Sequence, residues 1–141
     1  MHKILSDLAA VLDRANTEYQ LISESNTLVL PSKLKMLPNI NLATIIHVYD
    51  DQTAVVGVVS LFPLASLPRA TIDNAARVFQ QKYSGSDILI YVDKNGNLNF
   101  STKHLSLDGC GVDVLTKIFI SMLKFANDVF PEYIMYVKSR I

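Results

Sequence analysis

The chain has 141 residues, of which 50% are hydrophobic and 18% are charged, and its 13 basic and 13 acidic side chains balance. This length and this apolar content are typical of one folded domain and exclude a disordered or fibrous chain. The balanced charge gives no electrostatic reason to expect nucleic acid or an anionic membrane as a partner. Soluble domains average about 25% charged residues, so we expect another molecule to cover part of this surface.

The sequence also indicates a compartment. A single cysteine, Cys110, cannot form an internal disulfide, which fits a reducing cytosol. Asp7, Asp13 and Arg14 fall where a signal peptide needs an apolar core. The longest uncharged stretch, residues 52–68, is too short for a membrane helix. We therefore expect a cytoplasmic protein without a membrane segment.

The first forty residues predict a helix and a small hairpin. Apolar residues recur at three- and four-residue spacing over residues 2–16, as on one face of an amphipathic helix. Two short β-type runs follow at 19–23 and 27–30, with polar residues between them that suit a tight reversal. The next segment, 31–39, contains two prolines and is expected to be a loop.

A long hairpin is predicted for residues 40–49 and 53–62, which a short polar turn separates. The second strand of this hairpin is apolar on both faces, so we expect both faces to be covered. Gly57 lies in its middle and indicates either a bulge or the close approach of another backbone.

A second helix and a third hairpin follow. Ser66 is expected to cap the helix and Pro68 to open it, with its end near residue 85. Residues 87–92 and 97–102 predict strands joined at Asn95-Gly96, a pair that supplies the positive backbone angles of a hairpin turn. Every second residue of the later strand is polar, so one of its faces should be wet.

The last predicted element is a long helix over residues 112–133 that packs along the sheet. Pro131 lacks an amide hydrogen, so this helix should either break near Phe130 or bend and continue through Tyr136. The apolar run at 133–137 either closes the core or forms a partner surface.

Together these elements predict the order α-β-β-β-β-α-β-β-α in one domain, residues 1–141. Consecutive hairpins without strand-helix-strand alternation indicate an α+β fold. We expect an antiparallel sheet of five or six strands with helices packed on it.

Residues that could carry chemistry are few. His2, His47 and His104 lack the spacing of a metal-binding helix face, so no metal or cofactor is expected. His47 is either a ligand or base, or a hydrogen-bonded histidine within a strand. Asp50 and Asp51 are adjacent carboxylates, but their place at a hairpin tip favours solvated turn residues.

Cys110 lies between two glycines near a helix N-terminus, where the helix dipole can lower a thiol pKa. A cysteine nucleophile needs a positioned base, and the sequence assigns neither His104 nor His47 to that role. We therefore expect no catalytic residues, although a pocket in which these three side chains converge would make the protein a small-ligand binder or an enzyme.

Several of these segments, in this order, resemble the YbjN family, whose members are labelled bacterial sensory transduction regulators. The most specific part is the second half: the helix from Ile72, the 87–92 strand, the turn at 93–96, the link at 105–107 and a long helix ending in Asp128-Val129-Phe130-Pro131. The resemblance implies a fold like that of type III secretion chaperones, which typically dimerise and bind polypeptides without chemistry.

The first functional hypothesis is accordingly a non-enzymatic, protein-binding or regulatory module that forms a homodimer. Its predicted contact surface consists of Val55, Gly57, Val59, Tyr133 and Tyr136. The alternative is a chaperone for a specific partner, to which a peptide would add along a strand edge or groove.

Overall fold

Within its described residues, the structure has three α-helices and an antiparallel sheet of seven strands, in the α+β class that the sequence predicts. It is a computed structural model that describes residues 2–35, 37, 39–50, 52–61 and 67–140. The helices and strands are α1 (Lys3–Arg14), β1 (Gln20–Ile22), β2 (Thr27–Lys33), β3 (Asn41–Asp50), β4 (Thr53–Ser60), α2 (Arg69–Lys82), β5 (Ile88–Val92), β6 (Leu98–Thr102), β7 (Leu105–Ser106) and α3 (Val112–Lys138). Two short 3-10 turns, η1 (Ser23–Ser25) and η3 (Ser84–Ser86), precede β2 and β5.

The strands pair in the order β1-β2-β3-β4-β6-β5, and β7 pairs with the start of β4. β6 and β7 therefore share one side of β4 and leave a gap between them. The hydroxyl of Thr102 fills part of this gap, because its oxygen accepts a hydrogen bond from the backbone N–H of Val56 at 3.1 Å. A side chain thus replaces the strand partner that Val56 lacks at this point.

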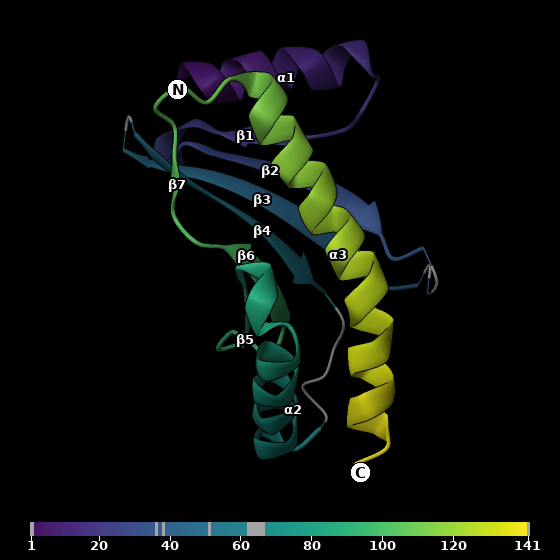
Figure 1. The fold of residues 1–141 in the computed structure, drawn as a ribbon. Helices are drawn as coiled ribbons and strands as arrows, with labels where there is room; N and C mark the ends of the chain where they lie inside the picture. The colour runs from purple at the N-terminus through teal and green to yellow at the C-terminus, as the bar shows by residue number, and fades with distance from the viewer. Residues whose placement is uncertain (1, 36, 38, 51, 62–66, 141) are drawn as a thin grey trace.

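All three helices lie on one face of the sheet (Figure 1). α3 runs across β4 and β6, α2 covers β5, and α1 packs against α3. The side chains of β3 and β4 alternate accordingly: Leu42, Ile46, Ala54, Val56 and Val58 point toward the helices and are buried. The core thus lies between the sheet and a single helix layer.

The long helix α3 continues through Pro131 to Lys138, which is the second of the two outcomes that the sequence allows. Phe130, before the proline, and Tyr133, Ile134 and Val137, after it, are all buried. Packing on both sides of Pro131 holds the helix together where one backbone hydrogen bond is missing.

The expectation of a loop over residues 31–39 is wrong for its first three residues. β2 extends to Lys33, and Pro31 pairs with Ala43 of β3. β1 reaches along β2 only as far as Val29, so β2 is an edge strand at Pro31. A missing N–H costs no ladder hydrogen bond at an edge, which is why the proline is tolerated there.

The expectation of a wet face on β6 is also wrong. Asn99 and Ser101, the polar residues of that face, are only 7% and 8% exposed. Both side chains are short, and on β5 the larger Tyr91 lies beside Asn99 and Leu89 lies beside Ser101. These larger neighbours on β5 shield the two polar side chains.

Two further predictions concern turns and caps. The hairpin between β5 and β6 is present, but only Gly96 has a positive φ, of 84°, while Asn95 does not. The turn is therefore the three-residue kind with a left-handed glycine, closed by the Asp93 N–H donating to the Asn97 carbonyl. α2 begins after Pro68, whereas the predicted cap, Ser66, lies outside the described residues.

Candidate protein-contact surface

The second face of the sheet carries no element of the described chain. We call it the open face and define it by three cross-strand rows of outward side chains. The rows are Thr27, His47 and Val55; Val29, Ile45, Gly57, Ser101 and Leu89; and Pro31, Ala43, Val59, Asn99 and Tyr91. None of these residues is Asp, Glu, Lys or Arg. Because a solvated sheet face normally alternates to polar residues, this one is unusual.

Large apolar and aromatic side chains protrude from the open face at the β5 edge and at the end of β3. Leu89 and Tyr91 on β5 are 42% and 47% exposed, and Tyr49 at the end of β3 is 56% exposed. Burial raises the pKa of the Tyr91 phenol, and the Asp93 carboxylate and the Tyr49 phenol act in the same direction. Both tyrosines line the same hollow, so they lie on the same side of the sheet.

Gly57 makes a shallow hollow near the centre of the open face. A Cβ atom at this position would lie 3.4 Å from the Phe100 carbonyl oxygen of β6. The β3–β4 register is regular at Gly57, so the sequence's alternative of a bulge is wrong, and the 3.4 Å distance is an ordinary contact rather than an approach that only glycine permits. The hollow has a volume of about 150 Å³, and Val55, Val59 and Ile45 line its walls.

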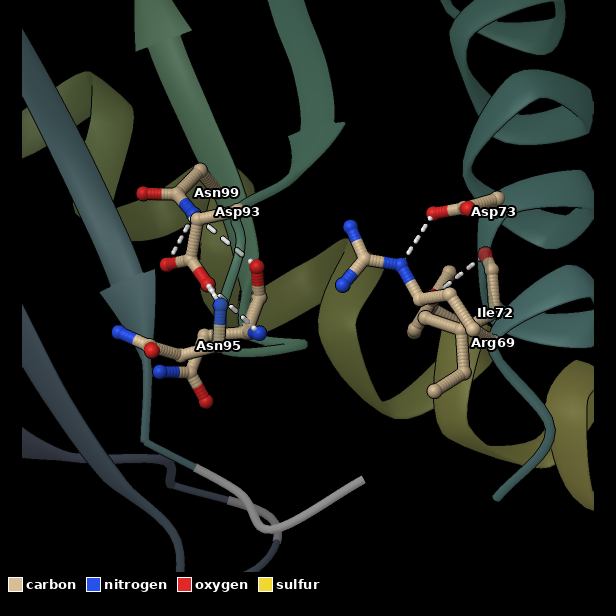
Figure 2. A network of polar contacts seen from close by, with 8 residues as sticks. Arg69, Ile72, Asp73, Asp93, Asn95 and Asn99 are labelled. Atoms are coloured by element: carbon tan, nitrogen blue, oxygen red, sulfur yellow. Dashed lines mark hydrogen bonds and ion pairs between the residues drawn. The ribbon is translucent and has the colours of Figure 1, made fainter. Parts of the chain in front are cut away.

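Polar groups on the open face already have partners inside the molecule. The Asn99 amide donates to Asp93 Oδ2 at 3.1 Å and to the Asn97 carbonyl at 3.0 Å. The same carboxylate accepts from the backbone N–H groups of Asn95 and Asn97, so one aspartate holds both the turn and the Asn99 side chain (Figure 2). Asn99 is therefore not an empty hydrogen-bonding site.

His47 is a hydrogen-bonded strand histidine in the structure. Its Nδ1 atom lies 2.9 Å from the Thr27 hydroxyl oxygen. Its ring meets Tyr49 edge to face at 4.3 Å, and the other side of Tyr49 stacks on His104 at 5.1 Å. The two histidines thus flank one tyrosine and extend the aromatic border of the open face.

The predicted contact residues separate into two groups. Val55, Gly57 and Val59 lie together on the open face, half-buried among their neighbours. Tyr133 is fully buried, donates its hydroxyl to the Ile72 carbonyl at 3.1 Å and packs edge to face on Phe79. This corrects the expectation that Tyr133 lies on a contact surface: it belongs to the core.

Tyr136 also lies on the helix side of the sheet, away from the open face. Its half-buried ring packs on Phe79, with the Arg140 guanidinium 4.6 Å from its centre. The sequence reasoning missed Ile45, Tyr91 and Leu89 as members of the surface. A usable signal was present in residues 40–49, where both alternating sets are largely apolar.

The residues considered for chemistry do not form one site. Cys110 lines a separate hollow of about 260 Å³ with His2, and its thiol lies 3.6 Å from the Gly111 carbonyl oxygen. His47 lines the hollow on the open face instead. Asp50 accepts a hydrogen bond from the Gln52 N–H, as a turn residue does, and Asp51 lies outside the described residues. Across the described ranges, no cluster of three His, Cys, Asp or Glu side chains could hold a metal ion.

The edges of the sheet are less accessible than its open face. On β5, the Gln80 side chain of α2 accepts from the Ile90 N–H at 2.7 Å and donates to the Ile88 carbonyl at 3.1 Å. This amide occupies the groups that an added strand would need. At the other edge β1 has only three residues, and β2 beyond it carries Pro31 and Lys33. Such features protect edges against strand addition.

The comparisons with known proteins place no family on this chain. No protein-family model matches it, and no curated protein matches it. Among the helices of the described residues, none combines the length and apolar character needed to cross a bilayer.

Proposed function

We propose that this protein is a non-enzymatic, protein-binding module that acts through the open face of its sheet, and that a second copy of the chain occupies this face. The observation that carries the proposal is the absence of any charged side chain from three cross-strand rows that no described element covers. Exposed apolar patches of this extent mark interaction sites in soluble proteins.

The three rows set the projected area of the open face. Strands lie about 4.8 Å apart and every second residue, about 6.6 Å along a strand, faces the same side, so the 13 residues of the rows project onto roughly 400 Å². A standard interface buries about 800 Å² per partner, so the rows supply about half of that area, and side-chain relief and the bordering Tyr49 ring add to it.

A second copy suits the open face for electrostatic and geometric reasons. The three rows carry no charged side chain, so two copies of them meet without like-charge repulsion and without leaving a buried charge unpaired. Antiparallel sheets pack face to face at about 10 Å with their side chains interdigitated. In a twofold arrangement, a ring such as Tyr91 of one copy can enter the hollow at Gly57 of the other, so the surface is complementary to itself.

A chaperone that adds a partner peptide as an extra strand is less well supported. Gln80 occupies the β5 edge, and the opposite edge is short and bears a proline. A face-to-face dimer with a regulatory role in the cytoplasm agrees with the dimerising fold that the resemblance to the YbjN family implies.

Sedimentation velocity at micromolar concentration tests the proposal. We expect the wild-type chain to sediment with twice its chain mass. Val59→Lys should give a folded monomer, because the substitution puts two unpaired ammonium groups into the interface and burial of each costs several kcal/mol. The dissociation constant should rise at least a hundredfold.

Val114→Lys is the matched control, since Val114 lies on α3, is 47% exposed and is distant from the open face. This variant should remain a dimer. Far-ultraviolet circular dichroism checks that both variants keep the fold. A wild-type chain that is monomeric at 100 µM, or a Val59→Lys variant that dimerises as well as Val114→Lys, would refute the proposal.

A further inference from the structure

A large hollow lies on the other side of the sheet, between α3 and the neighbouring ends of β5, β6 and β7. Its volume is about 570 Å³, within the range of roughly 300 to 1,000 Å³ that is typical of small-molecule sites. Its apolar lining consists of Ile88, Leu105, Ile118 and Met122. We call this hollow the α3 groove.

The rest of the lining of the α3 groove is polar and consists of Ser86, Asp87, Thr102, Lys103, Lys117 and Ser121. Lys103 lies 3.7 Å from Asp87, so those two charges largely cancel. Lys117, which is exposed, forms no ion pair with any residue that the structure describes. Ser121 follows it by one helical turn, so a cation and a hydroxyl lie together on the groove side of α3.

The side of α3 that lines the groove therefore carries two parallel stripes of side chains. Ile118 and Met122 form the apolar stripe, and Lys117 and Ser121, each one residue earlier, form the polar stripe. A ligand that is apolar along its body and anionic at one end matches both stripes at once. A purely polar anion would leave the apolar lining unused, and a neutral hydrocarbon would leave Lys117 without a partner.

We propose that the α3 groove binds a small amphipathic carboxylate of the fatty-acid type. The alkyl chain lies on Ile88, Leu105, Ile118 and Met122, and the carboxylate accepts hydrogen bonds from the Lys117 ammonium and the Ser121 hydroxyl. Because the groove lies on the helix side of the sheet, this site is independent of the open face and of the dimer proposed for it.

Isothermal titration calorimetry with hexanoate, octanoate and decanoate tests the apolar part of the proposal. Each added CH₂ group that becomes buried should tighten binding by up to about fourfold. Octanol, which has the same chain as octanoate but no charge, should bind about tenfold more weakly than octanoate, since a hydrogen bond to a charged group is lost. An octanol affinity equal to that of octanoate would overturn the assignment of an anion site.

Lys117→Gln tests the charged part. This variant should bind octanoate about tenfold more weakly and octanol with unchanged affinity. Lys124→Gln is the matched control, because Lys124 is an exposed lysine on the same helix that does not line the groove. Equal losses in the two variants, or no heat from any of the three carboxylates at millimolar concentration, would overturn the proposal. The Val59→Lys monomer should bind octanoate normally, so failure of one proposal leaves the other intact.

Discussion

Replacement of Tyr133 measures how firmly the C-terminal part of α3 is held in the core. The hydroxyl of this fully buried residue donates to the Ile72 carbonyl at 3.1 Å. Ile72 lies inside α2, where its carbonyl also accepts the ordinary helix hydrogen bond, so Tyr133→Phe removes a second bond and leaves no acceptor orphaned. We expect a loss of about 1 kcal/mol in the free energy of unfolding. Tyr133→Ala also removes the ring from its contacts with Phe79 and Phe130, and should cost about 3 to 5 kcal/mol.

The pH dependence of unfolding gives the same experiment a second readout. Burial raises the pKa of Tyr133 well above that of a free tyrosine. Above about pH 10 the unfolded chain loses this phenolic proton while the folded chain keeps it, so stability falls as the pH rises, by up to about 1.4 kcal/mol per pH unit. Below pH 10 both states are protonated and the term vanishes. Tyr133→Phe should therefore be less stable than wild type at pH 8 and should lose less stability between pH 10 and pH 11.

Urea unfolding followed by circular dichroism provides both measurements, with Tyr136→Phe as the control for a half-buried tyrosine on the same helix. The control should change the free energy of unfolding by less than about 0.5 kcal/mol at pH 8. A Tyr133→Ala variant that loses less than about 1 kcal/mol would show that the segment after Pro131 is not packed as described, and would return Tyr133 to the surface.

Two further predictions concern the ion pair on the helix side and the protected β5 edge. Glu132 accepts hydrogen bonds from Lys82 and Tyr83, and the Lys82 contact lowers the pKa of its carboxyl group. The resulting stabilisation is present above the ordinary pKa of glutamate and is lost as the pH falls through the lowered value. Glu132→Gln should therefore cost more stability at pH 7 than at pH 3, measured by urea unfolding. An equal loss at both pH values would contradict this. Gln80→Ala frees the Ile88 carbonyl and the Ile90 N–H at the edge of β5. This variant should aggregate faster at 37 °C, measured by light scattering, than the neighbouring Gln81→Ala variant. Equal rates of aggregation for the two would contradict the protective role of Gln80.

The sequence predicts most of the fold, because most of its signals are local. The apolar spacing of α1 and α3 and the glycine turn at residue 96 act within a few residues, and the structure contains all of them. The prediction was wrong at Pro31, because a proline is compatible with a strand that has no neighbour on its outer side. How far β1 extends along β2 decides this, and the residues around Pro31 do not reveal it. The prediction was wrong at Asn99 and Ser101 in the same way, since their burial depends on side chains that other strands supply.

Three of the five predicted contact residues lie on the open face, and the reason why the other two do not is physical. Val55, Gly57 and Val59 were identifiable because a strand that is apolar on both faces needs cover on both, whatever its neighbours are. Tyr133 carries the same kind of apolar signal, but a helix has only one buried stripe, and α3 turns this residue toward Phe79. Apolar character alone does not distinguish a core residue from a contact residue on a helix.

The edges of the sheet are protected against the addition of a strand, whereas its open face is not, and this difference bears on how the molecule binds a partner. At the edges of the sheet, Gln80 of α2 covers β5, and β2 carries Pro31 and Lys33; each of these residues discourages an added strand. The open face has no comparable protection, because its three rows contain no charged side chain that would keep the face in water. The sequence therefore disfavours association through backbone hydrogen bonds and leaves side-chain packing available. An interface made in that way fixes its partner by shape, and the hollow over Gly57 with the protruding Tyr49 and Tyr91 supplies the shape.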